Sequence, residues 1–280
     1  MSRGKSKTNY VSSTSKTRKN QRGKRTSNLL SPSKKSNTPK SLKEKLHDIY
    51  YGTVNLDTEC KGSCECCKVA MPQMNFCEFN QLINEIWDSS NKSQKLDLIC
   101  MSIEYFFRNE FEKWGKDSLI KPCMLLSEEG KCAYYDSRPL SCRLYGLWPE
   151  EDYNARVDKF EKAYEGLLKR EELPLNKQCP HVKRVDESSP ITKESIDKLF
   201  VRLDVLDALS GFSELSIRNK ENYRTFHDWL LYKVFGEDWL IKLTTFMLAA
   251  NRKVIEDQVK ALKDAVRSKF SKDMPDISGV

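Results

Sequence analysis

Hydrophobic residues recur at every third or fourth position along most of the chain after Pro39, which is the spacing of one face of an α-helix. Asn75 followed by Glu78 resembles a capping box at the start of one such segment, and Thr192 can cap another. The pattern predicts helices at about 42–50, 76–87, 94–114, 150–168, 193–206 and 226–234, and a long helix from about 238 to 270. We therefore expect a mainly α fold.

The helical period stops between about residues 119 and 148. This stretch is dense in Cys, Gly and Pro and contains the segment KPCMLLSEEGKCAYYDSRPLSCRLYGLW. Irregular backbone leaves N–H and C=O groups without regular partners. We therefore expect a loop region that something other than secondary structure holds in shape.

Length and composition limit the kinds of bond that could hold this loop region in shape. A chain of 280 residues with 39% hydrophobic residues can bury a core without disulfide bonds. It has neither an apolar run of about 18 residues, which a membrane span needs, nor the apolar region of a secretory signal. We expect a cytoplasmic protein without a membrane segment, in which the ten cysteines are metal ligands or redox groups before they are a disulfide framework.

The positive charge is concentrated at the N-terminus. Residues 1–40 contain twelve Lys or Arg and no Asp or Glu. Because the whole chain has a net charge of +8, residues 41–280 have a net charge of −4. With few apolar groups to bury, this tail is expected to be disordered and to suit a nucleic acid or another polyanion. A solubilising extension and an organellar transit peptide are the alternatives, although the apolar stripe of a presequence is missing.

Eight of the cysteines form two groups of four. The first group lies in the segment CKGSCECCK at residues 60–68, and the second is spread over 57 residues from 123 to 179. We predict that all eight bind metal: Cys60, Cys64, Cys66 and Cys67, with Cys123, Cys132, Cys142 and Cys179. They suit two four-coordinate sites, or one iron–sulfur cluster together with spare or redox-active cysteines.

The spacing favours an iron–sulfur cluster of the 4Fe–4S type, with zinc as the alternative. Zinc sites usually draw their ligands from two short knuckles, and this chain has only one such pair, Cys64 and Cys67. Cys66 and Cys67 are adjacent, and because neighbouring side chains diverge we expect them to serve different metals or different corners of a cluster. Arg138 and Arg143 are expected to bind the cofactor by balancing its negative charge.

At these residues the sequence resembles the CxxCxxCC cysteine-cluster family of zinc- or iron-chelating domains. Cys60, Cys66 and Cys67 match the signature, whereas the second cysteine falls one place late at Cys64, with Ser63 in its place. The resemblance continues in the later segment and ends near residue 145. The matching residues there are Cys123, Gly130, Cys132, Tyr135, Asp136, Arg138, Pro139, Cys142 and Arg143. The resemblance implies metal chelation, and one similar branch, the flagellin lysine methylases, is associated with an iron–sulfur cluster and a sulfonium methyl donor.

Two functions follow as hypotheses. An enzyme that uses its cluster to modify a protein or nucleic acid predicts an open metal corner and a small-molecule pocket near Arg138. A metal-stapled adaptor that binds RNA or another polyanion predicts closed four-thiolate sites and no pocket. Cys60, Cys64 and Cys67 also match the C-x3-C-x2-C spacing of radical enzymes, but the surrounding barrel repeats are missing. The sequence identifies no catalytic residue.

The expected organisation is a disordered basic tail at 1–40, a cysteine-cluster metal-binding domain at 41–185, a helical C-terminal module at 190–270 and a disordered end at 271–280. The fold class is mainly α, with irregular cysteine-rich metal-binding loops packed on helices. Outside the two groups, Cys100 is expected to be a packed thiol and Cys77 a structural one. His181 is either a substitute ligand or a solvent-facing side chain.

Overall fold

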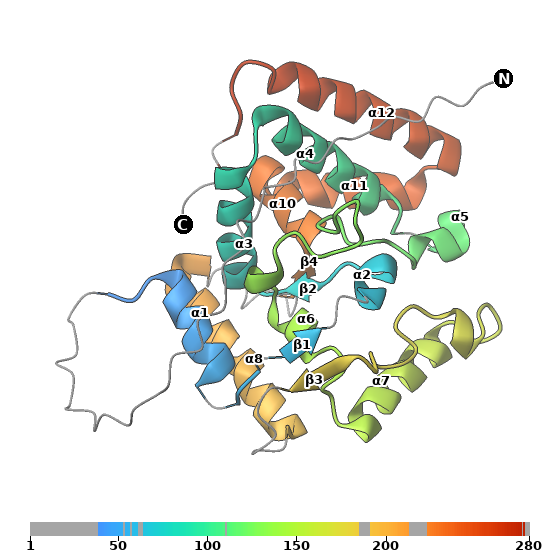
Figure 1. The fold of residues 1–280 in the computed structure, drawn as a ribbon. Coiled ribbons are helices and arrows are strands. Elements are labelled where there is room, and N and C mark those ends of the chain that lie inside the picture. The colour runs from blue at the N-terminus through green and yellow to red at the C-terminus, as the bar shows by residue number, and fades with distance from the viewer. Residues whose placement is uncertain are drawn as a thin grey trace.

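The computed structural model describes residues 39–52, 54–56, 58–60, 64–109, 111–184, 191–212, 223–275 and 277. The predicted basic tail lies outside these residues except for Pro39 and Lys40. The chain is mainly helical, as the hydrophobic pattern predicted, and Figure 1 shows the arrangement of its elements.

The helices are α1 (Leu42–Tyr51), α2 (Glu65–Val69), α3 (Phe76–Ser89), α4 (Lys92–Phe107), α5 (Phe111–Trp114), α6 (Leu140–Leu144), α7 (Glu150–Ala163), α8 (Lys193–Asp207), α10 (Phe226–Phe235), α11 (Glu237–Ala249) and α12 (Arg252–Lys269). Short helical turns lie at Gly115–Ser118, Tyr135–Ser137, Arg170–Glu172 and Ala208–Phe212. The strands are β1 (Thr58–Cys60), β2 (Gln73–Met74), β3 (Val182–Arg184) and β4 (Arg224–Thr225). β1 pairs antiparallel with β3, and β2 pairs antiparallel with β4.

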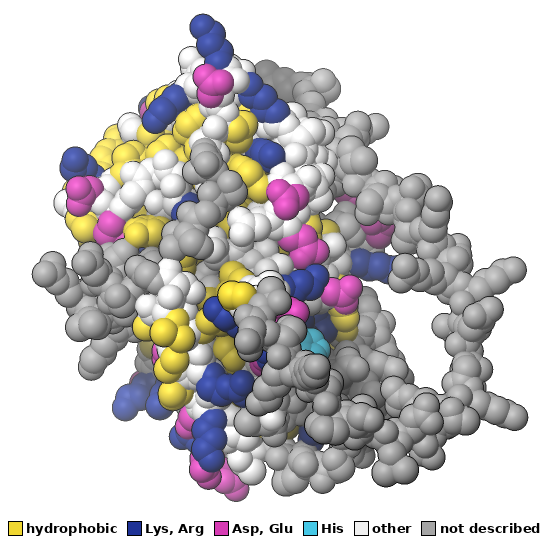
Figure 2. Space-filling view, turned by 90° about the vertical axis from the view of Figure 1, so that its left-hand side faces the viewer, with side chains coloured by type: hydrophobic (Ala, Val, Ile, Leu, Met, Phe, Trp, Pro, Cys, Tyr) yellow, Lys and Arg dark blue, Asp and Glu magenta, His cyan; other side chains and the backbone are white. Residues whose placement is uncertain are grey.

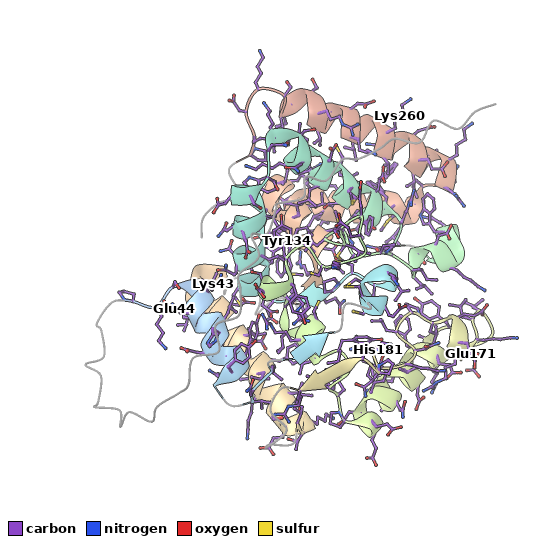
Figure 3. The ribbon with its side chains drawn as sticks, in the orientation of Figure 1. Lys43, Glu44, Tyr134, Glu171, His181 and Lys260 are labelled. Carbon is purple, nitrogen blue, oxygen red and sulfur yellow. The ribbon has the colours of Figure 1, made fainter. Side chains whose placement is uncertain are left out.

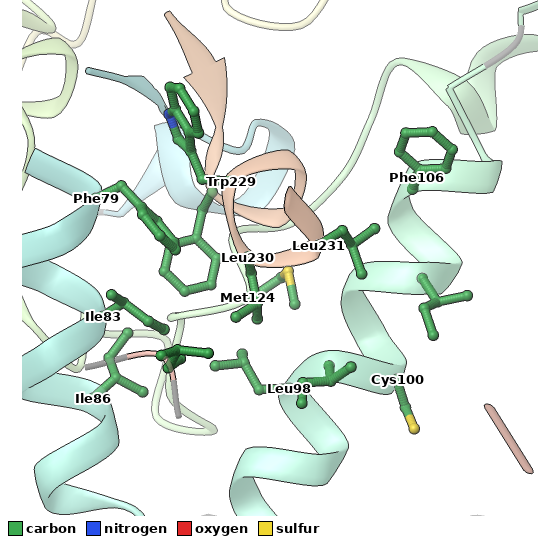
Figure 4. Close-up of a cluster of buried hydrophobic side chains, with 14 of the residues drawn as sticks. Phe79, Ile83, Ile86, Leu98, Cys100, Phe106, Met124, Trp229, Leu230 and Leu231 are labelled. Atoms are coloured by element: carbon green, nitrogen blue, oxygen red, sulfur yellow. The ribbon is translucent and has the colours of Figure 1, made fainter. Parts of the chain in front are cut away.

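The larger hydrophobic cluster lies among α3, α4, α10, α11 and α12, in the upper half of Figure 1. At its centre Trp229 of α10 packs on Phe79 and Phe76 of α3, with ring centroids 6.3 and 5.2 Å apart. Figure 4 shows Phe79 beside Trp229, with Ile83 and other apolar side chains around them. The indole Nε1 of Trp229 donates to the Met74 carbonyl at 2.8 Å, so the buried ring leaves no donor unpaired.

A second hydrophobic cluster joins α1, α6 and α8, and two buried carboxylates link it to the start of α3. Asp207 accepts hydrogen bonds from the backbone N–H groups of Phe76 and Cys77 at 3.1 and 2.6 Å. Glu78 accepts from the Tyr50 hydroxyl at 2.5 Å and from the Leu140 N–H at 2.6 Å. Burial raises the pKa of Glu78 to about 7.

Two predicted helices are each interrupted. The helix expected at 94–114 ends at Phe107, and α5 begins only at Phe111. The long helix expected from 238 stops at Ala249, because the Asn251 side chain accepts from the Val254 N–H at 3.1 Å and caps a new helix. Periodicity alone missed both breaks because the apolar spacing continues across them.

The C-terminal helices share their cores with the N-terminal ones. α10, α11 and α12 pack with α3 and α4, while α8 packs with α1 and α3, so each hydrophobic cluster contains residues from both sides of the expected boundary near 185–190. Near the expected disordered end at 271–280, Met274 packs against the larger cluster and Ile277 is buried in it.

The described surface carries both signs of charge. On the face in Figure 2, Lys and Arg side chains lie next to Asp and Glu side chains. Exposed ion pairs occur on the described surface, such as Lys198 with Glu194 at 2.6 Å. No helix within the described part of the chain has the length and hydropathy needed to cross a membrane.

Candidate thiol-lined site

Seven of the eight predicted ligand cysteines line one cavity. The cavity has a volume of about 460 Å³ and lies among α2, α6, α7 and the loops that connect them. Its thiols come from both sequence groups: Cys64, Cys66, Cys67, Cys123, Cys132, Cys142 and Cys179. The backbone of Cys60 lies in β1, and its side chain falls outside the described residues. The fold thus brings together two cysteine groups that are more than 50 residues apart in the sequence.

Backbone pairing fixes the first group against Cys123. Cys66 and Cys67 lie in the short helix α2, directly after Cys64, whose backbone is left-handed with φ 46°. The Cys123 N–H donates to the Cys67 carbonyl at 2.6 Å, and the Lys121 N–H donates to the Val69 carbonyl at 3.1 Å. These bonds hold residues 121–123 alongside α2 and place the Cys123 thiol beside the thiols of Cys66 and Cys67.

Cys132 and Cys142 are positioned by a tight turn and a short helix. The turn is closed by the Ser127 N–H, which donates to the Lys131 carbonyl at 2.7 Å, and Gly130 supplies its left-handed residue with φ 73°. An antiparallel bridge between Leu126 and Cys132 follows directly. Cys142 lies on α6, where Leu140 anchors the helix in the second hydrophobic cluster.

Gly146 allows Cys179 to approach the site. A Cβ at Gly146 would lie 2.9 Å from the Cys179 carbonyl oxygen, and the φ of 91° also favours glycine. Next to it, the Gln178 side chain donates to the Trp148 carbonyl at 2.9 Å and accepts from the Trp148 N–H at 3.1 Å. The segment before β3 is therefore tied to the segment after α6, which places Cys179 at the cavity.

Cys66 and Cys67 point the same way, and the expectation that their side chains diverge is wrong. Their sulfurs are 3.8 Å apart, because α2 is a single short turn that brings both thiols to the cavity wall. A hydrogen bond from the Cys67 thiol lowers the pKa of Cys66 to about 7, and the positive charge of Arg138 acts in the same direction. The Cys67 pKa is raised in turn.

The other thiols lie close enough to interact through their charges. The pKa of Cys123 is raised to about 12, mainly by burial and to a smaller extent by negative charge on Cys132, Cys66 and Cys64. The pKa values of Cys132 and Cys142 are also raised, first by burial and then by neighbouring thiols. Several thiolates in this cavity would repel one another, so the arrangement favours a cation among them.

The two predicted arginines have different surroundings. Arg138 lines the cavity, where its guanidinium lies 3.5 Å from the Tyr135 ring centroid and its Nε donates to the Tyr135 carbonyl. Arg143 is buried outside that lining and donates to the Tyr51 hydroxyl and to the carbonyls of Asp136 and Arg138, each at 2.7–2.9 Å. Its geometry ties the loop to α1, whereas Arg138 faces the thiols.

The remaining candidates lie away from the cavity lining. Cys77 is buried at the start of α3, and burial raises its pKa, which outweighs the lowering expected from the helix dipole. Cys100 is buried in the larger hydrophobic cluster, with its Sγ 4.0 Å from the Lys263 carbonyl oxygen. His181 is exposed beside β3, as Figure 3 shows.

The donor set suits a metal that thiolates bind, although no ion can be placed in the side chains as they stand. Across the described ranges, no three His, Cys, Asp or Glu side chains are grouped closely enough to hold a metal ion. The 3.8 Å between the Cys66 and Cys67 sulfurs equals the separation of about 3.8 Å expected for two thiolates on one tetrahedral ion with metal–sulfur bonds of about 2.3 Å. One pair thus has ligand spacing, and the other thiols would have to move towards it.

Sequence reasoning missed the polar and aromatic part of the wall. Lys121 and His227 both line the cavity and are almost fully buried. Neither residue belongs to a sequence motif. In the sequence, Lys121 resembles a surface charge in a loop, and His227 follows Phe226 in an apolar helix. Aromatic residues form much of the remaining wall, namely Tyr134, Tyr135, Tyr145, Trp148, Tyr153, Phe160, Phe200 and Tyr223. Of these, periodicity had placed Tyr153 and Phe160 on the apolar face of α7 and Phe200 on that of α8, and the motif had included Tyr135, but none of them was expected at a site.

Comparison with known proteins gives no relative. The chain matches no protein-family model, no curated protein and no solved structure. The resemblance to the cysteine-cluster family therefore stays a prediction from the motif.

Proposed function

We propose that the protein binds an iron–sulfur cluster through its two cysteine groups at this cavity, and that it is an enzyme acting on a molecule that enters the same cavity. The observation that carries the proposal is the convergence of seven thiols from two distant segments on one cavity. In a chain that can bury its core without cross-links, such a cluster of thiols has a chemical rather than a stabilising purpose.

Electrostatics supports metal binding. Neighbouring thiols help to raise the pKa values of Cys123, Cys132 and Cys142, and Arg138 is the arginine whose charge acts on Cys66, Cys132 and Cys142. One guanidinium cannot balance several thiolates. A bound cation would favour their deprotonation and draw the loops that carry them towards one another, so that metal binding and loop ordering are coupled.

The number of thiols and the size of the cavity favour a cluster over zinc. A structural zinc ion takes four ligands in a closed shell, and seven thiols around about 460 Å³ exceed what one such site uses. An iron–sulfur cluster is a larger inorganic core that gathers thiolates from distant segments, and when bound it supplies electron transfer or an open metal position. The sulfurs of Cys66 and Cys67 have the separation of two thiolates on one metal, which suits one iron of a 2Fe–2S core. A 4Fe–4S core takes one thiolate per iron, so there the two sulfurs would move apart.

The pocket favours an enzyme over an adaptor. A closed four-thiolate site predicts no pocket, whereas Arg138 and the thiols share their cavity with aromatic side chains. This wall can bind an organic molecule next to the metal, by stacking and by burial of apolar surface. Modification of a protein or nucleic acid, as the resemblance to lysine methylases implies, remains a proposal about the substrate.

Purification without oxygen tests the proposal. Protein expressed with ample iron should be brown and should contain iron and acid-labile sulfide in similar amounts, with little zinc, as measured by elemental analysis and sulfide assay. Colourless protein with stoichiometric zinc under the same conditions would contradict the cluster and favour the adaptor. Protein without any metal would contradict both.

A further inference from the structure

One end of the cavity is lined by polar side chains instead of thiols. Lys121 and His227 lie there with exposed fractions of only 9% and 1%, and Asn109 and Ser118 are part of the same lining. Charged and titratable side chains this deeply buried are rare without partners, since burial of an unpaired polar group costs free energy. Lys121 and His227 are therefore expected to have hydrogen-bond partners.

The imidazole of His227 has one nitrogen without a partner. Nε2 lies 3.2 Å from the Thr225 hydroxyl oxygen, and that hydroxyl donates its only hydrogen to the Asp228 carboxylate. The Thr225 oxygen can then only accept from Nε2, which places the ring proton on Nε2 and leaves Nδ1 as an acceptor. Nδ1 is buried and has no hydrogen-bond partner among the described residues.

Burial keeps this acceptor unprotonated. Desolvation lowers the pKa of His227 to about 4, and the positive charge of Lys121 acts in the same direction while Asp228 opposes it. At neutral pH the side chain is therefore a neutral imidazole. His227 is part of the cavity lining, so a ligand N–H or O–H group that reaches the edge of its ring would find an acceptor that no described protein group uses.

Lys121 supplies a cation close to this acceptor. Its Nζ donates to the Asn109 side-chain oxygen and to the Tyr105 carbonyl, which uses two of its three hydrogens. The Tyr105 ring packs on the His227 ring with centroids 5.7 Å apart, so one residue contacts both groups. The positive charge and the free acceptor therefore lie at the same end of the cavity, with aromatic side chains along the rest of the wall.

We propose that this end of the cavity binds the polar head of a small organic acid, with its carboxylate at Lys121 and an adjacent N–H or O–H donor at Nδ1 of His227. The aromatic wall takes the apolar body of the ligand and directs it towards the thiols. The reaction of the bound ligand rests on the proposed function, whereas the binding itself does not.

Anthranilate is a suitable probe, because it is a fluorescent ring that carries a carboxylate next to an amino group. The full-length protein, purified without oxygen, is titrated with anthranilate, with benzoate and with aniline. Each variant is also assayed for iron and sulfide. Anthranilate should bind more tightly than benzoate, which lacks the donor, and more tightly than aniline, which lacks the anion.

Two variants and two matched controls assign the contacts. Lys121→Met should weaken anthranilate binding at least about tenfold, because a hydrogen-bonded charge is lost, and should leave aniline binding unchanged. His227→Gln keeps a polar group near Thr225 but removes the acceptor at the Nδ1 position, so it should weaken anthranilate and not benzoate. Lys43→Met, on the exposed side of α1 in Figure 3, and His47→Gln should change neither.

The outcomes separate this inference from the proposed function. Loss of anthranilate affinity in Lys121→Met with unchanged iron and sulfide supports the inference. No anthranilate binding at millimolar concentration by protein that holds its cluster would overturn it and leave the proposed function standing. Selective binding by protein that never holds iron would support the inference and reject the cluster.

Discussion

The helical cluster around Trp229 and the thiol-lined cavity are built on opposite principles. In the cluster, long helices bring apolar side chains into mutual contact, and even the indole N–H of Trp229 has its partner in Met74. In the cavity, short elements and loops bring thiols and Lys121 to a common space, which His227 reaches from the first turn of α10. The first region is stabilised by its own side chains, whereas the second exposes reactive and charged groups to whatever occupies the cavity.

This difference predicts where stability depends on a ligand. Burial of apolar surface stabilises the helical cluster at any metal concentration. The loops at 119–148 have little regular structure, and metal binding would contribute directly to their order. Substitutions in the two regions should therefore have effects of different kinds.

The largest effect is expected at the cysteines. Cys142→Ser should abolish most iron and sulfide binding and should increase hydrogen exchange at 119–148, because loss of one ligand removes both the cluster and the order it gives the loops. Elemental analysis and exchange mass spectrometry measure the two consequences. The helices of the Trp229 cluster should keep their protection.

Cys100→Ser is the matched control. Cys100 is buried in the helical cluster and does not line the cavity, so its substitution should retain the metal and cost only packing energy, about 1 kcal/mol. If Cys142→Ser kept its full metal content, the thiol-lined cavity would not be the metal site. If Cys100→Ser lost metal, the separation of the two regions would fail.

The next effect is a loss of packing that leaves the metal in place. Phe79 is fully buried between Phe226 and Trp229, and Phe79→Ala should lower the free energy of unfolding by about 3–5 kcal/mol. Phe160→Ala makes the same change in the cavity wall, where the ring is 41% exposed, and should cost about 1 kcal/mol or less. Denaturant unfolding measures both. Similar costs for the two variants would contradict the contrast.

The two regions also differ in how far the sequence predicts them. Periodicity found α1, α3, α8 and α10 and the capping box of Asn75 and Glu78, because each buries one regular face. It missed the breaks after Phe107 and Ala249, because the apolar pattern continues across both; the second break is set by the Asn251 cap. Helices whose ends are set by a single side chain are predicted in type but not in extent.

The cavity was predicted only in part. Spacing and motif selected the seven cysteines that line it and Arg138, because ten cysteines, eight of them in two groups, stand out in a sequence of this length. They gave no sign of Lys121 or His227, because both pack against Tyr105 of α4, a contact that only the folded chain brings about. Arg143 was grouped with Arg138 from the motif, although its partners are Tyr51 and two loop carbonyls.

The last effect concerns Glu78, which lies where the two regions meet, and it changes only how stability depends on pH. Its carboxylate accepts from the Leu140 N–H at the start of α6, the helix that carries Cys142, and burial raises its pKa from 4.5 to about 7. Between these values the folded protein holds a proton that the unfolded chain has released. The free energy of unfolding should therefore fall as pH rises from about 4.5 to 7, by at most about 3 kcal/mol, and this contribution should be constant above pH 7.

Glu78→Gln isolates that contribution, because glutamine does not titrate. His227 acts in the opposite direction, since its pKa is lowered to about 4 and its neutral form is favoured in the folded state, but it is present in both proteins and cancels in their difference. Denaturant unfolding of both proteins at pH 5, 6, 7 and 8 should show wild-type stability declining relative to the variant up to pH 7. A difference independent of pH would mean that Glu78 is ionised throughout, and that its hydrogen bonds to Tyr50 and Leu140 outweigh its burial.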